Sequence, residues 1–240
     1  MKFSIITVTY NDLDNLKVTY CSVKNQTFTD YEYLVVDGGS TDGTVDYLEY
    51  IKNNDSRVRY VSEKDQGIYD AMNKGVKLSA GEYILFLGAA DTFYSYDILD
   101  IVCNYLSYGW DAIYGKCEYS SGAKKGELIG HKLTHLNILL DKWIAHQSVF
   151  VKRDLLIDYP FDLKYKTYSD QDFMIKIQTL KYKLKYFDKI FCYYDGLGFS
   201  ASKENEEEKR LEKMNMLKTY YPFLYLLRLC GHVIKGYFGW

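Results

Sequence analysis

Residues 34–44 read LVVDGGSTDGT, a short apolar run that ends in an acidic residue and continues as a loop of Gly, Ser, Thr and Asp. This pattern is typical of a buried parallel strand that places a carboxylate, here Asp37, at the carboxyl end of a sheet. In open α/β folds, ligands bind at that edge. Two other apolar runs also end in polar residues, SIITVTYN at 4–11 and YILFLGAAD at 83–91. We therefore expect three strands to direct polar groups into one crevice.

Strand and helix signals alternate along the N-terminal part of the chain. Strands are expected at 3–9, 32–36, 58–61 and 83–87, and helices at 13–25, 43–53 and 68–78. Further helices are expected at 95–107, from Ser169 and at 204–218. Further strands are expected at 111–117 and 147–152, with one or two more within 184–195. Such alternation implies right-handed crossovers. It predicts an α/β fold with a Rossmann-like, mostly parallel central sheet flanked by helices.

Composition excludes several classes of protein. The hydrophobic content of 48% and the charged content of 26% are ordinary for a water-soluble domain. A net charge of -2 argues against a nucleic-acid partner, which a basic surface would hold. The five cysteines form no CxxC pair, so neither a zinc site nor a disulfide framework is expected. The sequence shows no signal-peptide pattern and no apolar run of about 18 residues, which favours a cytoplasmic location.

The last segment, 220–240, differs in composition from the rest of the chain. It is rich in Tyr, Phe and Leu, with Arg228, His232 and Lys235 as isolated cations. This mixture predicts a helical tail that lies at a membrane interface and makes a peripheral membrane contact. The alternative is a helix packed on the domain or across a homodimer.

Six motifs in order resemble family 2 glycosyltransferases. They are ITVTYN at 6–11, VDGGSTDGT at 36–44, GIYDAMNKG at 67–75, GEYILFL at 81–87, the pair His146-Gln147, and SDQD at 169–172. The resemblance runs from about residue 2 to 200. It implies the GT-A fold and transfer of a sugar from a nucleotide-sugar donor with inversion at the anomeric carbon. It also implies a catalytic domain at 1–200, with a nucleotide-binding half at 1–91 and an acceptor half at 92–200, followed by C-terminal helices at 201–240.

Three residues at strand ends are candidates for binding the nucleotide base. A base needs an apolar slot and hydrogen bonds at its edge, which Thr9, Tyr10 and Asp37 can supply, with Asp37 accepting from a base N–H. The resemblance implies a uracil-type pocket and a UDP-sugar, with GDP as the alternative. Tyr10 can instead be a packing aromatic and Asp37 a helix-capping carboxylate. Asp42 is expected to be the N-cap of the following helix.

The segment 67–75 begins a helix after a polar turn. A helix N-terminus at the crevice can face the diphosphate or the donor sugar. Asp70 and Asn73 are three residues apart and hence on one face of that helix. In the resembling family this segment borders the donor site, so both residues are donor-binding candidates.

The metal motif departs from the family pattern. The family places two acidic residues at the end of the fourth strand, where Mn²⁺ or Mg²⁺ binds and bridges the leaving diphosphate. Here residues 88–91 read GAAD, so Asp91 is the metal-ligand candidate and Ala90 stands where relatives have a donor-contacting acid. One lost charge-assisted hydrogen bond costs about 1.5–3 kcal/mol. The alternative function is therefore a nucleotide-sugar-binding protein with impaired catalysis.

An inverting transfer also needs one carboxylate to accept the proton of the acceptor hydroxyl. Asp170 and Asp172 are the candidates from the residues alone, and Asp170 matches the catalytic position of the family. Ser169 is expected as an N-cap, with Asp172 in a capping box. The resemblance places His146, Gln147 and Asp172 on the acceptor side, although a lone histidine is more often structural.

The remaining hypotheses concern a lid over the donor, the acceptor and two competing classes of protein. Residues 196–200 resemble a Gly-rich lid over the donor, with an ordinary turn as the alternative, and 118–145 is the expected acceptor region. The acceptor implied by the bacterial relatives is an oligosaccharide or a lipid-linked saccharide of surface-polysaccharide biosynthesis. A Rossmann dehydrogenase is disfavoured because no GxGxxG follows the first strand. A nucleotidyltransferase is disfavoured because the N-terminus lacks a Gly-rich phosphate loop.

Overall fold

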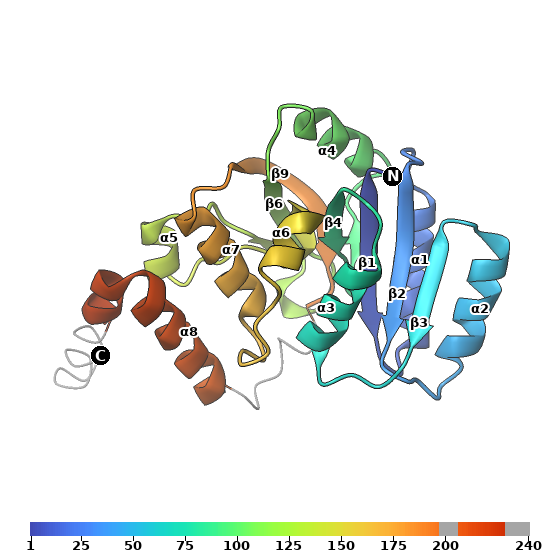
Figure 1. The fold of residues 1–240 in the computed structure, drawn as a ribbon, viewed down its shortest axis with the longest axis horizontal. Helices are drawn as coiled ribbons and strands as arrows, with labels where there is room; N and C mark the ends of the chain where they lie inside the picture. Colours follow the sequence, from blue (N-terminus) through green and yellow to red (C-terminus); the bar gives the residue numbers. More distant parts are fainter. Residues whose placement is uncertain (197–205, 229–240) are drawn as a thin grey trace.

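The N-terminal half of the sheet is built from four parallel strands (Figure 1). The computed structural model describes residues 1–196 and 206–228. These strands are β1 (Phe3–Thr9), β2 (Tyr31–Asp37), β3 (Val58–Ser62) and β4 (Tyr83–Phe86). They lie in the order β3-β2-β1-β4, so the carboxyl ends of all four meet at one edge.

The sheet continues past β4 with strands of both directions. They follow in the order β8 (Val149–Lys152), β6 (Ala112–Tyr119), β9 (Leu184–Tyr194) and β5 (Thr92–Phe93), while β7 (Leu128–Ile129) pairs with β6. β8 is antiparallel to both β4 and β6, whereas β6 and β9 are parallel. The second half of the chain thus extends the first sheet instead of forming a separate one.

Helices cover both faces of this sheet, because alternate strand residues point to opposite sides. Ile5 belongs to one apolar cluster and its neighbour Ile6 to the other. The cluster of Ile5 includes α1 (Leu13–Lys24), α2 (Thr44–Asn54) and α4 (Ile98–Leu106). The cluster of Ile6 includes α3 (Ile68–Leu78), α5 (His135–Leu139), α6 (Arg153–Asp158), α7 (Ser169–Thr179) and α8 (Glu206–Tyr220). Two short 3₁₀ helices, η1 (Gly122–Lys124) and η2 (His146–Ser148), complete the elements.

The α/β class, the mostly parallel sheet and the flanking helices are confirmed. Four features of the second half were not expected as such: β5, β7, α6 and the single long β9. Two-residue strands and a six-residue helix are too short to leave a readable periodicity. Of the lid predicted at 196–200, all but Gly196 lies outside the described residues.

Helix α3 packs unusually close to β1. A Cβ added at Gly75 would lie 2.7 Å from Cγ2 of Ile6, so glycine is the residue that fits at this crossing. The close approach fixes the whole helix against the sheet. Its N-terminus, which begins at Ile68, is thereby held near the carboxyl edge of β1 and β2.

The C-terminal segment packs on the domain through α8. Leu217 and Leu224 belong to the cluster that contains α7, and residues 222–228 are helical. No helix in the described part of the chain is long and apolar enough to cross a membrane. Of the predicted interfacial tail, residues 229–240, with His232 and Lys235, lie outside the described ranges.

Candidate active site

Asp37 organises the loop at the end of β2. Its buried carboxylate accepts hydrogen bonds from the backbone N–H groups of Gly39 at 3.1 Å and Ser40 at 3.0 Å. The hydroxyls of Ser62, at 2.6 Å, and Ser40 donate to it as well. Because Ser62 ends β3, the carboxylate joins two strand ends and the loop between them. That it also accepts from a base N–H stays a prediction.

The loops after β1 and β2 are tied to each other. Asn11, at φ 48°, accepts a hydrogen bond from the backbone N–H of Thr41 at 2.8 Å. Asp42 accepts from the N–H of Leu13 at 3.1 Å, which links it to the start of α1. The N-cap of α2 is Gly43, at φ 95°, so the expectation that Asp42 is the N-cap was wrong. Glycine suits the left-handed backbone at position 43. Asp42, just before it, instead binds the backbone at the start of α1.

The base-binding candidates lie together at the ends of β1 and β2. Thr9 pairs in register with Asp37, and its buried Oγ1 has no hydrogen-bond partner among residues 1–196 and 206–228. Tyr10, which follows β1, is 64% exposed. A Cβ at Gly38 would lie 2.9 Å from Asp65 Oδ2 and 3.3 Å from the Tyr10 ring. The exposed ring of Tyr10 and the buried hydroxyl of Thr9 thus lie near the Asp37 loop, and their binding of a base stays a prediction.

The two donor candidates on α3 both have structural partners. Asp70 accepts from the N–H of Gln66 at 3.0 Å and lies 3.6 Å from Nζ of Lys74. The Asn73 amide donates to the carbonyl of Phe161 and accepts from its N–H, both at 2.9 Å. Asn73 therefore anchors the segment that precedes α7. Contact of either residue with a donor stays a prediction.

The turn after β4 presents Asp91. The Asp91 N–H donates to the Gly88 carbonyl at 3.1 Å, and Ala90 within this turn has φ 72°. The Asp91 carboxylate is only 3% exposed and accepts from the N–H of Asp195 at 3.0 Å. Burial raises its pKa from 3.8 to about 6, against the opposing effects of the Asp195 N–H and of His146.

These features fit a divalent cation bound through one carboxylate. Within residues 1–196 and 206–228, no lysine or arginine forms an ion pair with Asp91 and no group of three or more His, Cys, Asp or Glu is placed to hold a metal. A buried carboxylate without a cationic partner is costly. Mn²⁺ and Mg²⁺ often take one or two protein carboxylates and fill the remaining positions with water and phosphate oxygens.

The antiparallel pairing of β4 and β8 brings two distant segments together. Tyr83 pairs with Lys152 and Ile84 with Val151. Residues that follow β4 therefore lie beside residues that precede β8, which places the turn of Asp91 near η2. The negative charge of Asp91 acts to raise the pKa of His146, at the start of η2.

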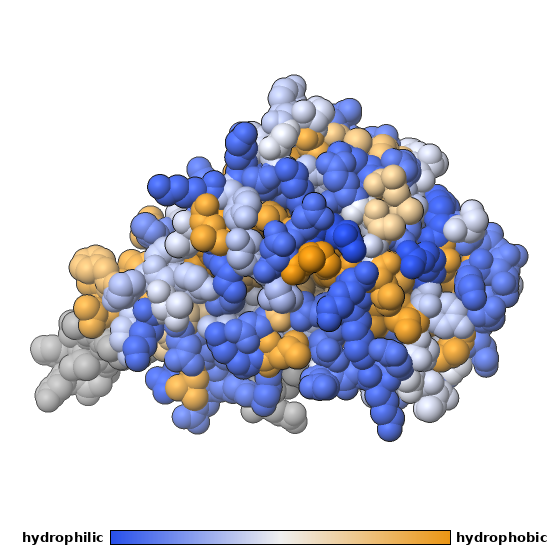
Figure 2. Space-filling view, in the orientation of Figure 1, coloured by the Kyte–Doolittle hydropathy of each residue, from blue (hydrophilic) through white to orange (hydrophobic). Residues whose placement is uncertain are grey.

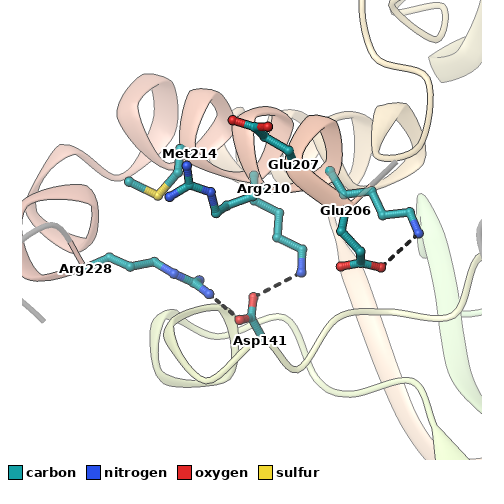
Figure 3. A pocket seen from close by; sticks show the side chains of 8 residues that line it. Asp141, Glu206, Glu207, Arg210, Met214 and Arg228 are labelled. Atoms are coloured by element: carbon teal, nitrogen blue, oxygen red, sulfur yellow. Dashed lines mark hydrogen bonds and ion pairs between the residues drawn. The ribbon is translucent and has the colours of Figure 1, made fainter. Parts of the chain in front are cut away.

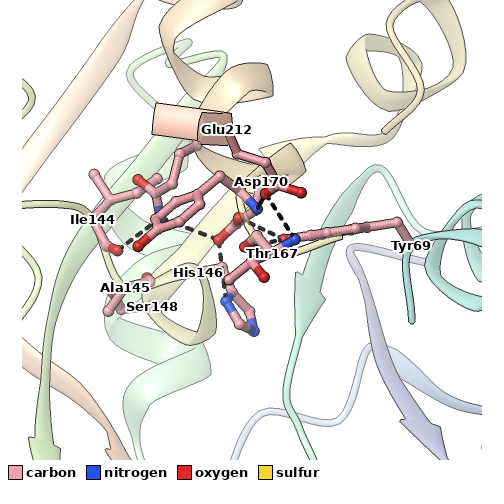
Figure 4. Close-up of polar contacts among 10 residues, drawn as sticks. Tyr69, Ile144, Ala145, His146, Ser148, Thr167, Asp170 and Glu212 are labelled. Carbon is pink, nitrogen blue, oxygen red and sulfur yellow. Dashed lines mark hydrogen bonds and ion pairs between the residues drawn. The ribbon is translucent and has the colours of Figure 1, made fainter. Parts of the chain in front are cut away.

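Asp170 also lies beside His146, in the first turn of α7 (Figure 4). Its Oδ1 accepts from the Tyr69 hydroxyl at 2.8 Å, and its Oδ2 accepts from Gln171 Nε2 at 3.1 Å. Nδ1 of His146 lies 3.3 Å from the same Oδ2. Burial and the Asp170 charge raise the pKa of Tyr69 well above 10, so its hydroxyl remains a donor.

His146 is electrostatically coupled to both carboxylates. Burial lowers its pKa, but the contact with Asp170 and the charge of Asp91 together raise it above 6.5. A cavity of about 20 Å³ adjoins His146 and Asp170, and its other walls are apolar. That volume is about what one water molecule needs. The centre therefore combines a buried carboxylate with an imidazole whose pKa is raised, beside a cavity of about the size of one water molecule.

Asp172, two residues from Asp170, points elsewhere because residues in a helix are rotated by about 100° each. It lies 3.7 Å from Nζ of Lys176 and accepts hydrogen bonds from the hydroxyls of Tyr165 and Tyr220. These contacts join α7 to α8. An acceptor-side role for Asp172 stays a prediction.

Gln147 lies between Asp91 and β9. Its side chain donates a hydrogen bond to the Asp91 carboxylate, and its carbonyl accepts from Sγ of Cys192 at 2.9 Å. Gln147 is thus close to the metal-ligand candidate, and its role toward an acceptor is untested.

The capping box expected at Ser169 was wrong. The N-cap of α7 is Tyr168, without a capping side chain, and the buried Oγ of Ser169 has no partner. The N–H groups of the three residues just before this helix, 166–168, donate to Glu212, whose distance along the chain hides this contact from the sequence.

A larger cavity of about 500 Å³ lies away from these carboxylates, between α8 and the loop after α5 (Figure 3). Asp141 accepts from Arg228 and lies 3.5 Å from Nζ of Lys213. The wall of this cavity contains acidic and basic side chains, among them the paired Asp141 and Arg228. It has none of the features that distinguish the centre around His146.

Comparison with known proteins identifies the sequence relatives of this chain. A sequence model described as Glycosyl transferase family 2 matches residues 4–151. A PGL/p-HBAD biosynthesis glycosyltransferase of Mycobacterium tuberculosis is 36% identical over 178 residues, which cover 72% of this chain and 68% of that protein. An uncharacterized glycosyltransferase of the same species is 30% identical over 233 residues, covering 92% of this chain and 85% of the relative.

Solved structures share the fold at lower identity. S. aureus TarS 1–349 in complex with UDP-GlcNAc has a TM-score of 0.75 and 22% identity, over 92% of this chain and 66% of that chain. The mannosyltransferase PcManGT from Pyrobaculum calidifontis, in complex with GDP-Man and Mn²⁺, has a TM-score of 0.65 and 18% identity, over 90% of this chain and 61% of that chain.

The raised pKa of Asp91 predicts how stability depends on pH without metal. The pKa of Asp91 is higher in the folded protein than in the unfolded protein, so its ionisation lowers the free energy of unfolding above the folded pKa. This destabilisation disappears as the pH falls toward the pKa of the unfolded protein. With EDTA present, removing the charge with Asp91→Asn should improve stability, relative to the unchanged protein, by about 2 kcal/mol more at about pH 7.5 than at about pH 4.5. Urea unfolding at both pH values measures the difference, and a pH-independent difference would contradict the assignment.

Proposed function

This chain belongs to glycosyl transferase family 2, and we propose that it is an inverting enzyme that moves a sugar from a UDP-sugar to a glycan acceptor. One observation carries the proposal: His146 lies within the electrostatic reach of two buried carboxylates, Asp91 after β4 and Asp170 at the start of α7. The attacking hydroxyl needs a carboxylate as base, and the leaving diphosphate needs a cation, which a second carboxylate can hold.

The donor is proposed to bind across the ends of β1 and β2. Thr9 has an unpartnered buried hydroxyl there, and Tyr10 offers an exposed ring on which a base can stack. Asp37 would accept from the base N–H. UDP is favoured because the structural neighbour of higher TM-score holds UDP-GlcNAc, whereas the GDP-Man complex of the other keeps GDP as the alternative.

Asp91 is the residue that would hold Mn²⁺ or Mg²⁺. Such a cation supplies Lewis-acid stabilisation of the negative charge on the departing nucleoside diphosphate. Gln147 donates to Asp91 and keeps its carboxylate oriented toward the turn. A protein acid for the leaving group is then unnecessary.

Asp170 is proposed to be the general base. As the acceptor hydroxyl attacks the anomeric carbon, its proton passes to Asp170 while the bond between that carbon and the diphosphate oxygen breaks. Tyr69 and Gln171 donate to the carboxylate and fix its orientation. A single displacement of this kind inverts the anomeric configuration and needs one base and no protein nucleophile.

The acceptor is proposed to be an oligosaccharide or lipid-linked saccharide at the cytoplasmic face of a membrane. Phe223, Leu226 and Leu227 on the helical segment 222–228 are exposed, and so are Leu136 and Leu140 beside α5. The ring of Tyr221 contacts His135, so the two segments adjoin. Figure 2 shows orange residues at this end of the molecule. Such a patch suits a membrane surface, with a homodimer contact as the alternative.

A second candidate function is donor binding with impaired turnover. The turn offers Asp91 but no neighbouring acid, since Ala90 occupies the preceding position at φ 72°. Asp and Asn enter this left-handed region more readily than Ala does. The backbone at position 90 thus suits the acid that the family usually has there.

Removing the proposed base should abolish turnover and leave donor binding intact. In Asp170→Asn the amide oxygen can still accept from Tyr69, so the fold should persist. Release of UDP from a panel of UDP-sugars with Mn²⁺ should fall roughly 10²–10⁴-fold. Asp188→Asn, at an exposed position on β9, is the matched control and should stay within about twofold. Activity retained within tenfold, by the same scale, would reject Asp170 as the base.

Restoring the missing acid should distinguish the two candidate functions. If Ala90 impairs turnover, Ala90→Asp should raise UDP release roughly ten- to hundredfold. Ala90→Gly is the control, because it accepts the left-handed backbone without adding a charge. Equal gains from both variants would assign the effect to backbone strain, and no gain from Asp would remove the support for the impaired-enzyme alternative.

Membrane contact predicts binding to vesicles through the apolar patch. The protein should cosediment with phosphatidylcholine vesicles that contain phosphatidylglycerol. The triple variant Phe223→Ser, Leu226→Ser and Leu227→Ser should bind at least about tenfold less, because each large apolar side chain contributes about 1.5–3 kcal/mol on burial. Tyr50→Ser, on exposed α2, is the control. Equal vesicle binding by the triple variant would contradict the proposal, and a mass change with concentration would favour the homodimer.

A further inference from the structure

Glu212, in the middle of α8, is a buried acidic residue whose carboxylate is hydrogen-bonded to the backbone. Glu212 is only 6% exposed, and its carboxylate accepts three backbone hydrogen bonds. The donors are the N–H groups of Lys166 at 2.6 Å, Thr167 at 3.1 Å and Tyr168 at 3.1 Å. All three belong to the segment that leads into α7 (Figure 4).

The place of these donors gives the contact its significance. The first backbone N–H groups of a helix have no partner within the helix. The Tyr168 N–H belongs to the N-cap of α7, whereas the N–H groups of Lys166 and Thr167 precede the helix, so Glu212 holds the chain where it enters α7. The negative charge also lies at the favourable end of the α7 dipole. Asp170 follows two residues after Tyr168.

The link from Glu212 to Asp170 is continuous. The carbonyl of Thr167, whose N–H donates to Glu212, lies 2.7 Å from the Tyr69 hydroxyl. That hydroxyl also lies 2.8 Å from Oδ1 of Asp170. The other end of the segment is held by the double hydrogen bond between Asn73 and Phe161. Movement of residues 166–168 would therefore displace Tyr69 or Asp170.

We propose that Glu212 is a positioning residue for the base Asp170. It holds residues 166–168, and through them the Asp170 carboxylate, at the geometry that proton transfer requires. The inference rests on the proposed function of Asp170. It adds α8, which lies beyond the residues 4–151 matched by the family model, to the parts of the chain on which turnover depends.

The first link is tested by hydrogen–deuterium exchange of the backbone amides in Glu212→Gln. The amide oxygen of Gln can replace one carboxylate oxygen, but its NH₂ group would face N–H donors. Exchange at residues 166–168 should accelerate at least about tenfold, while β1 and β2 stay unchanged. Glu208→Gln is the matched control, since Glu208 pairs only with the exposed side chain of Lys166 at 2.7 Å. Unchanged exchange at 166–168 would overturn the proposal.

The second link is tested by a double-mutant cycle in which UDP release from UDP-GlcNAc with Mn²⁺ is measured. Glu212→Gln alone should lower kcat roughly ten- to hundredfold and leave the donor KM within about twofold, because the donor loops are untouched. In the Asp170→Asn background the same change should have less than about a twofold effect. Glu212→Asp, which keeps the charge but is one methylene shorter, should fall between Gln and Glu and serves if Gln does not fold.

The outcomes separate the two proposals. Losses that multiply in the double variant, or a donor KM that rises as much as kcat falls, would make Glu212 a merely structural residue. Full activity of Asp170→Asn would reject Asp170 as the base and with it the positioning role, even where exchange confirms the contact. If no UDP is released from UDP-GlcNAc, kcat and KM are measured on the UDP-sugar from the panel that is turned over. Absence of release from every sugar rejects the proposed function and the positioning role together.

Discussion

The structure depends on how carboxylates removed from water find hydrogen-bond donors. A buried, ionised carboxylate is tolerated only when its oxygens are paired. Asp37 receives donors from the loop and strand next to it, whereas Glu212 receives them from a segment distant in sequence. Asp91 differs, because burial raises its pKa to about 6 despite hydrogen bonds from Asp195, Gln147 and Gly88. The raised pKa supports the proposal that Asp91 holds a cation.

The geometry of the sheet turns this constraint into a two-sided site. Parallel strands bring Thr9 and Asp37 to one edge, where we propose that the nucleotide binds. The antiparallel addition of β8 next to β4 then brings His146 to the turn that contains Asp91. The half predicted to bind the acceptor thus supplies the imidazole and Asp170, and the half predicted to bind the nucleotide supplies Asp91. Neither half holds the proposed catalytic set by itself.

The sequence predicted what short-range patterns encode. The apolar run before Asp37 and the start of α7 at Ser169 were read directly, because strand and helix periodicities extend over several residues. From the residues alone Asp170 and Asp172 were both candidates, and the resemblance selected Asp170. The structure places them in different surroundings, Asp170 by His146 and Asp172 between two tyrosines.

The features that escaped prediction depend on long-range contacts. The segment that enters α7 is held by Glu212 on α8, and Asn73 binds the backbone of Phe161, so neither partner leaves a local signal. Two-residue strands such as β5 exist only because β9 is beside them.

The most direct test of the account is a thermal-shift titration with UDP, GDP and dTDP, each with Mn²⁺ and with EDTA. If Asp91 and the diphosphate share a cation, UDP should raise the melting temperature most, and Mn²⁺ should strengthen that effect. Stabilisation by no nucleotide would contradict a donor site at the ends of β1 and β2. Stabilisation by UDP that is unchanged by Mn²⁺ would contradict the role assigned to Asp91.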